Sequence, residues 1–281
     1  MRTFPRTIAA AALATALLAL AAHAPAGAAS TAVDPATPAG VQPAAGPPGT
    51  LVFSDEFTGS ALDTAKWKVR DQERTESDRT DGIRWWYKPA NVRVIPDNGG
   101  NLAIDLRKLT TNQYAGGRVD TDGVFDYTHG TIEARIHVPP TEGHLGAVWL
   151  QAHSMGSELG TAADGAEIDL LESAYTDDRY AATIHYDGYG TDHKQSSQIV
   201  AAPSLHTTHY HTIGLNWAAS KMEFTYDGTV VRAVTDTKLI SQVKEYPILS
   251  HEVLDWAAGD VTTAPLDYQS TMYVDYVRVW Q

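Results

Sequence analysis

The chain has 281 residues, no cysteine and a formal net charge of −13 at neutral pH. The negative charge argues against nucleic acids and anionic membranes as partners, because both would repel an acidic protein. Without cysteine, thiol catalysis and thiolate metal sites are excluded, and the fold must be stabilised by its core alone. These properties fit a soluble protein that acts on a neutral polymer.

The first fifty residues carry signals of export and of a linker. Residues 1–29 combine a basic start, an apolar run from Ile8 to Ala22 and the small-residue sequence AGA, which are typical of a secretory signal peptide. The apolar run is shorter than the ~20 residues that a membrane-spanning helix needs. Residues 30–50 are rich in Pro, Ala and Gly, which predicts a disordered or extended linker. We therefore expect a secreted, extracellular protein whose folded domain spans residues 51–281.

Strand signals dominate the chain after the linker. Apolar and polar residues alternate in 101–108, 130–138 and 272–280, so each segment places its apolar side chains on one face. An Asp-Gly dipeptide joins two β runs within 221–234 and predicts a hairpin. Helix signals are confined to one short segment. Many short strands separated by Gly and Asp turns indicate an all-β antiparallel sandwich.

Segment 164–175, which reads DGAEIDLLESAY, places three carboxylates within an apolar run. Glu167 and Asp169 are two residues apart, so they share one face of a strand. On a regular strand Glu172 would point to the opposite face, into the core, where a carboxylate is costly to desolvate. A β-bulge at Leu170–Leu171 would shift the phase and return Glu172 to the face of the other acids. The pattern therefore predicts a bulged strand with three carboxylates on a concave outer face.

Two carboxyl groups on one face can form the pair that retaining glycosidases use. One carboxylate attacks the anomeric carbon, and the other, protonated, delivers a proton to the leaving oxygen. Crowding of three acids separates their pKa values, as this division of roles requires. The three acids could instead be solvated surface groups or a Ca²⁺ site. The apolar residues between them and the aromatic residues nearby argue against both alternatives.

The sequence EIDLLE resembles the catalytic strand of glycoside hydrolase family 16 in its bulged E-x-D-x-x-E form. Further segments resemble the family in the same order along the chain: LVFSDEFTGSALDTAKW, GRVDTDGVFDYTHGTIEARIHVP, GAVWLQ, HTIGLNWAASKMEFTYDG and MYVDYVRVW. The resemblance implies a concanavalin A-like β-jelly-roll sandwich of two curved antiparallel sheets with a long sugar-binding cleft. It also implies retaining endo-hydrolysis without a cofactor, with Glu167 as nucleophile, Glu172 as general acid/base and Asp169 as assistant.

The substrate stays open at this point, because two segments depart from the common pattern. Residues 246–260 read YPILSHEVLDWAAGD where laminarinase-type members usually carry an NLAVGG-like strand, and IHYDGYGTDHK (184–194) is not the common glucanase form. We expect a monomer that hydrolyses a polysaccharide, foremost a β-1,3-containing glucan. A β-galactan or algal galactan hydrolase, a lectin-like protein that only binds carbohydrate, and a wall-remodelling transglycosylase are the alternatives. The intact set of three acids argues against the lectin.

Residues around the acids are candidates for sugar contacts. Trp149 lies in GAVWLQ, on the strand expected to neighbour the catalytic one, and is expected on the cleft floor near the cleaved bond. His185 is expected on another strand of the same sheet, in contact with a sugar hydroxyl or an acid. The other candidates are Trp85 and Trp86 at the cleft rim, Glu252 and Trp256 in the divergent segment, and Asn91 and Arg118. Packing, turn and salt-bridge roles compete with sugar binding at these positions.

The resemblance also implies a structural Ca²⁺ on the convex side, away from the acids. The matching positions are Glu56, the turn at Gly99 and Gly100, and Asp275. Carboxylate and carbonyl oxygens are the ligands that this ion prefers. The competing explanation is that Asp275 simply points outward on its strand.

Overall fold

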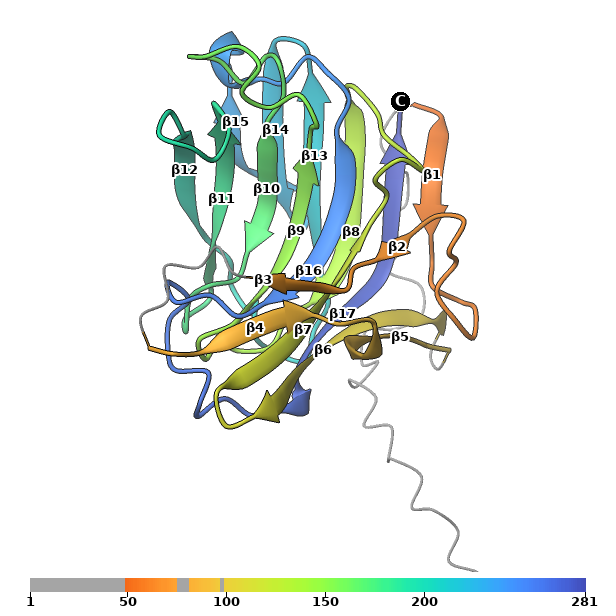
Figure 1. Cartoon of the computed structure of the whole chain (residues 1–281). Coiled ribbons are helices and arrows are strands. Elements are labelled where there is room, and N and C mark those ends of the chain that lie inside the picture. Colours follow the sequence, from red (N-terminus) through yellow and green to blue (C-terminus); the bar gives the residue numbers. More distant parts are fainter. Residues whose placement is uncertain (1–48, 75–80, 97–98) are drawn as a thin grey trace, which may run out of the picture. The chain divides into compact units, whose positions relative to one another are not determined.

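The computed structural model describes residues 49–74, 81–96 and 99–281 (Figure 1). The predicted signal peptide and residues 30–48 of the predicted linker lie outside the described residues, so both remain predictions. Within the described part of the chain, no helix is both long enough and apolar enough to cross a membrane.

The strands of the described residues form two main sheets, which we call the front and the back sheet. In spatial order, the front sheet contains β12 (Lys194–Ala201), β11 (Arg179–Tyr186), β10 (Glu167–Glu172), β9 (Leu145–Gln151), β16 (Tyr246–Glu252), β7 (Gln113–Asp120) and β2 (Lys68–Val69). Figure 1 shows β10, β9 and β16 running side by side. The back sheet contains β15 (Thr229–Val234), β14 (Lys221–Tyr226), β13 (His211–Ala218), β8 (Gly130–His137), β17 (Asp267–Trp280), β6 (Asn101–Thr110) and β5 (Val92–Ile95), with β1 (Leu51–Asp55) beside the end of β17.

The hairpin of β6 and β7 joins the two sheets, because β6 pairs with β17 in the back sheet and β7 pairs with β16 in the front sheet. Two short strands, β3 (Gln72–Arg74) and β4 (Arg84–Tyr87), extend this junction, and short 3₁₀ turns span Pro89–Asn91 and Thr237–Leu239. β4 runs parallel to β7, whereas the other pairings between described strands are antiparallel. The predicted antiparallel sandwich is therefore confirmed, and the pairing of β4 with β7 is its one parallel exception among the described strands.

The main core lies between the two sheets and follows the predicted alternation. In β8, Ile132, Ala134 and Ile136 are buried, whereas the residues between them are partly exposed. Their counterparts on the front sheet include Leu150 and Ile168, which belong to the same cluster of buried residues. Burial of each large aliphatic side chain contributes roughly 1.5–3 kcal/mol. The core thus fixes which face of β9 and β10 turns inward, and with it which residues face outward.

Candidate active site

The predicted β-bulge is present in β10. Asp169 pairs with Trp149 on β9 and Leu171 pairs with Val148, so Leu170 is the extra residue without a partner on that strand. On the other side, β11 also shows a register shift between Asp169 and Glu172. Both Leu170 and Leu171 are buried in the core. The bulge therefore turns two consecutive apolar residues inward and leaves Glu172 on the outer face.

His185 lies beside the acids, as its expected strand position predicts. It is the direct partner of Glu167 across β10 and β11. Its Nε2 atom lies 3.3 Å from Asp169 Oδ2 and 3.8 Å from Glu167 Oε1. Among the described residues, this is the only trio of acid and imidazole ligand atoms that lie within 4.8 Å of one another, so the three could also hold a metal ion.

Tyr189 also contacts the nucleophile candidate, and sequence reasoning did not identify it. Its hydroxyl donates a hydrogen bond to Glu167 Oε2. The same hydroxyl accepts a hydrogen bond from Gln151 Nε2 at 2.5 Å. Gln151 is in turn the cross-strand partner of Glu167 on β9. The departure of segment 184–194 from the common pattern was the only sequence signal that pointed to this region.

Glu172 is held from the side of β11. Thr183 Oγ1 donates a hydrogen bond to Glu172 Oε2 at 3.2 Å, and lies 3.0 Å from Ser197 Oγ on β12. Thr183 is the partner of Asp169 across the strands. The short polar side chains of two neighbouring strands therefore fix one oxygen of Glu172.

The three acids have different electrostatic surroundings. Burial raises the pKa of Glu172 well above its ordinary value, and the negative charges of Asp169 and Glu167 raise it further. Burial also raises the pKa of Asp169 well above its ordinary value, followed by the charge of Glu167. Burial raises the pKa of Glu167 as well, but His185 and the hydrogen bond from Tyr189 oppose that rise. The surroundings thus favour protonation of Glu172 more strongly than protonation of Glu167.

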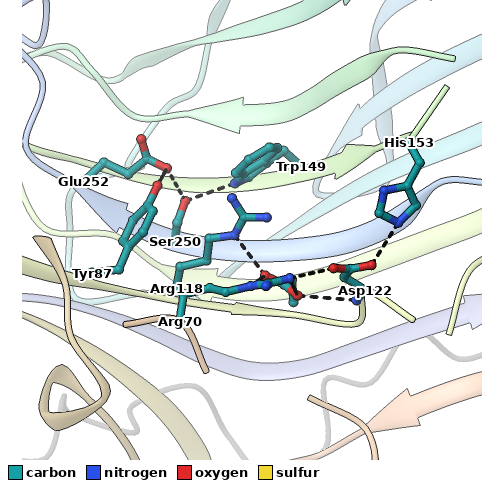
Figure 2. A network of polar contacts seen from close by, with 9 residues as sticks. Arg70, Tyr87, Arg118, Asp122, Trp149, His153, Ser250 and Glu252 are labelled. Carbon is teal, nitrogen blue, oxygen red and sulfur yellow. Dashed lines mark hydrogen bonds and ion pairs between the residues drawn. The ribbon is translucent and has the colours of Figure 1, made fainter. Parts of the chain in front are cut away.

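Trp149 and Glu252 belong to one hydrogen-bonded chain on the outer side of the front sheet (Figure 2). Trp149 Nε1 donates to Ser250 Oγ at 3.0 Å, and Ser250 Oγ donates to Glu252 Oε1 at 2.7 Å. The Tyr87 hydroxyl donates to the same carboxylate oxygen at 2.7 Å. Glu252 is close enough to raise the pKa values of all three acids of β10. Both predicted residues therefore lie beside the candidate site, and their sugar contacts stay predictions.

Arg118 connects this chain to a second set of ion pairs, also drawn in Figure 2. The guanidinium carbon of Arg118 lies 4.8 Å from the centre of the Trp149 ring. Its Nε donates to Asp120 at 3.0 Å, and Arg70 binds the same carboxylate with two hydrogen bonds of 2.6 Å. Asp122 accepts from Arg70 at 2.8 Å and contacts His153 at 2.8 Å. Arg118 therefore forms the predicted salt bridge, with Asp120, and also lies against Trp149, which is expected on the cleft floor.

The predicted rim tryptophans differ in their exposure. Trp85 is only 1% exposed and belongs to a small core cluster, so its ring is not available to a sugar and the prediction is wrong for it. Trp86, the next residue of β4, is partly exposed because successive residues of a strand point to opposite faces. Trp256 is 49% exposed in the turn after β16. Asn91 is buried and donates to two main-chain carbonyls, which is a structural role.

The two carboxylates of the expected calcium site are paired with arginines. Both carboxylate oxygens of Glu56 accept hydrogen bonds from Arg278, at 2.8 and 2.7 Å. Asp275 forms an ion pair with Arg135. Gly100 has a φ of +98°, and a Cβ there would lie 2.3 Å from the Phe57 carbonyl oxygen. A cation would have to compete with two guanidinium groups, so the arrangement does not favour calcium, which stays a prediction.

The sequence profile of glycosyl hydrolases family 16 matches residues 80–278, which is more than half of the chain. The chain therefore belongs to this family.

The chain is similar to several characterised proteins. It is 24% identical over 261 residues to glucan endo-1,3-beta-glucosidase A1 of Niallia circulans, and 25% identical over 252 residues to the clotting factor G alpha subunit of Tachypleus tridentatus. Each alignment covers 82% of this chain but only 38% and 34% of the respective relative, so the chain spans little more than a third of their length.

Solved structures of similar fold include two glucanases. An endo-β-1,3-glucanase from Pyrococcus furiosus has a TM-score of 0.63 and 25% identity, over 83% of this chain and 94% of that one. A non-specific endo-β-1,3(4)-glucanase has a TM-score of 0.66 and 26% identity, over 84% and 96% of the two chains.

Proposed function

We propose that the chain is a retaining endo-β-glycanase that hydrolyses internal bonds of a glucan with β-1,3 linkages. The observation that carries the proposal is the bulge of β10, which brings Glu172 to the face of Glu167 and Asp169. Such a pair of carboxyl groups with separated pKa values is what retaining hydrolysis requires.

In the first step Glu172 acts as the general acid. Its raised pKa keeps it protonated, and Thr183 occupies its Oε2 atom, so Oε1 is left to deliver the proton. As the proton moves to the glycosidic oxygen, that bond breaks and a carboxylate oxygen of Glu167 bonds to the anomeric carbon. Asp169 lies on the same face between the two glutamates, and its carboxyl group adjusts the nucleophile.

In the second step the covalent intermediate is hydrolysed. Glu172, now ionised, removes a proton from water, and the resulting oxygen attacks the anomeric carbon. The bond to Glu167 breaks, and both carboxyl groups return to their starting states. Two inversions at one carbon leave the product with the configuration of the substrate.

The relatives support a glucan as the substrate. One relative is named for 1,3-β-glucan cleavage, and two from Rhizobium meliloti are named endo-1,3-1,4-beta-glycanases. The net charge of −13 agrees with a neutral polymer. We infer that sugar rings bind along the outer face of the front sheet, beside the acids of β10, because the bulge turns all three carboxyl groups to that face.

A lectin on the same fold is disfavoured by the electrostatics of the site. Burial raises the pKa values of Glu167, Asp169 and Glu172 together, so each ionised form is destabilised in the folded protein. A protein that only binds neutral sugars gains nothing from this arrangement. Catalysis gives a reason for it, because functional sites are where such shifts accumulate.

The proposed activity can be tested with purified protein on laminarin, lichenan, agarose, carrageenan and galactan. We expect new reducing ends from laminarin, with the β-anomer formed first in a proton NMR time course. The Glu167→Gln variant is the matched control, since it keeps the shape of the side chain. Release from a galactan alone would replace glucan as the substrate, and no release from any polymer would contradict the proposed activity.

We also infer that the protein is exported and acts as a monomer. The support for export is the signal-like sequence of residues 1–29 together with a polymeric substrate, which is met outside the cell. N-terminal sequencing of protein from the culture medium should give a start near residue 30, and light scattering should give the mass of one chain.

A further inference from the structure

The loop between β11 and β12, residues 187–193, reaches back over the acids. It carries Tyr189, whose hydroxyl bridges Glu167 and Gln151. Apart from this contact the tyrosine is 62% exposed, so its position is not explained by core packing. A large aromatic side chain that is mostly exposed and yet bonded to a partly buried acid indicates a role in the site.

The loop is built to stay in place. It begins with Asp187 and Gly188 at φ values of +66° and +72°, a sharp left-handed turn. The carboxylate of Asp187 is buried, accepts a hydrogen bond from the Gly160 main chain at 2.8 Å, and pairs with Lys194 at the other end of the loop. These contacts tie the two ends of the loop to each other and Asp187 to the Gly160 main chain, so Tyr189 is presented on a fixed base.

A second residue of the loop supports the neighbouring imidazole. His193 Nε2 lies 2.8 Å from His185 Nδ1, and the two rings stack at an angle of 9°. The other nitrogen of His185 faces Asp169 and Glu167. The loop thus contacts the nucleophile candidate twice, directly through Tyr189 and indirectly through His185.

We propose that Tyr189 is a positioning residue that holds Oε2 of Glu167 and leaves Oε1 free to attack the anomeric carbon. This inference rests on the proposed function, because it assigns a task within the same site. A hydroxyl that donates to an ionised carboxylate forms a strong, charge-assisted hydrogen bond and fixes the rotamer of the acid. Fixing the nucleophile at the attack distance lowers the entropic part of the barrier.

The proposal predicts a kinetic effect of one hydroxyl. Tyr189→Phe keeps the ring and removes the hydroxyl that donates to Glu167 and accepts from Gln151. Because Glu167 then loses its positioning bond, kcat on the polymer should fall about tenfold or more while KM changes little. The matched control is Tyr210→Phe, which removes a hydroxyl that bonds to Asn101 on the back sheet. Both variants should melt within a few degrees of the wild type. Wild-type kcat in Tyr189→Phe would overturn the proposal.

A second measurement does not depend on turnover. The groups within electrostatic reach of Glu167 are His185, Tyr189, Asp169, Glu172, Glu252, Glu245 and Arg118. All except Tyr189 are unchanged in Tyr189→Phe, so the loss of its hydrogen bond should raise the pKa of Glu167. Carbon-13 NMR of protein labelled at the glutamate carboxyl, assigned with Glu167→Gln, follows this titration directly.

The two measurements separate the possible failures. A raised Glu167 pKa in Tyr189→Phe but not in Tyr210→Phe supports the positioning role, even if no tested polymer is cleaved and the proposed activity fails. An unchanged Glu167 pKa with a higher KM would mean that Tyr189 serves the substrate, and that result overturns the proposal.

Discussion

Glu172 lies on the same outer face of β10 as Asp169, although three positions along the chain would place the two residues on opposite faces of a regular strand. The unpaired Leu170 on the β9 side accounts for the difference. The Thr183 hydroxyl then reaches Glu172 Oε2, while its strand position is opposite Asp169. The bulge is therefore the feature from which the chemistry of the site follows.

Removal of the acid/base should separate the two steps of hydrolysis. Glu172→Ala should lose most activity on polymer but still cleave an aryl glycoside whose leaving group needs no proton. Added azide should then restore the second step and give a glycosyl azide, which mass spectrometry detects. An aryl glycoside that is cleaved no better than polymer would count against this role.

Shortening the bulge should be tolerated better than shortening a regular strand. Deletion of Leu170 removes one buried leucine but leaves three acids in regular alternation, so the pairing of the flanking residues is kept. Deletion of Ile184, an equally buried residue of β11, shifts the phase of the rest of that strand. Circular dichroism and melting temperatures should show that the Leu170 deletion is more stable than the Ile184 deletion. Equal unfolding of both variants would contradict the role assigned to the bulge.

The active-site acids should reduce stability as the pH rises. The pKa of Glu172 is raised in the folded state, so the folded protein holds its proton more tightly than the unfolded chain. This contribution to stability is present below the ordinary value of 4.5 and is lost as the pH rises through the folded pKa. Glu172→Gln should therefore melt at a higher temperature than the wild type at pH 8. The expected rise is about 2–4 °C for each kcal/mol by which the free energy of unfolding increases. The difference in melting temperature between the two proteins should shrink toward pH 4. A difference that stays constant with pH would contradict this prediction.

His137 should have the opposite effect on the pH dependence of stability, reducing stability as the pH falls. Burial, together with the nearby His206 and His211, lowers its pKa to about 4 from an ordinary value of 6.5. The unfolded chain therefore takes up the proton first, and stability that is fully present above pH 6.5 is lost as the pH falls toward 4. His137→Gln should lose less melting temperature between pH 7 and pH 4.5 than the wild type. His209→Gln, at an exposed histidine, is the control and should follow the wild type.

Much of the site could be predicted from the sequence, because strand periodicity is a local property. The cost of a buried carboxylate predicted the bulge. The expected order of the strands predicted that Trp149 and His185 lie on strands of the same sheet as the acids. Periodicity did not decide which of Trp85 and Trp86 faces inward, since either phase of β4 presents an aromatic ring to each side. Tyr189 was missed because a loop has no period, and its path over Glu167 depends on the turn at Asp187 and on tertiary contacts.

The most direct test of the account is to identify the residue that carries the covalent intermediate. A 2-deoxy-2-fluoro β-1,3-glucobiosyl fluoride should form the intermediate and slow its hydrolysis, so the sugar stays attached to the protein. Peptide mapping by mass spectrometry should find it on Glu167, and the Glu167→Gln variant should remain unlabelled. A label on Glu172 or another residue, or turnover of the reagent with inversion and no label, would contradict the account.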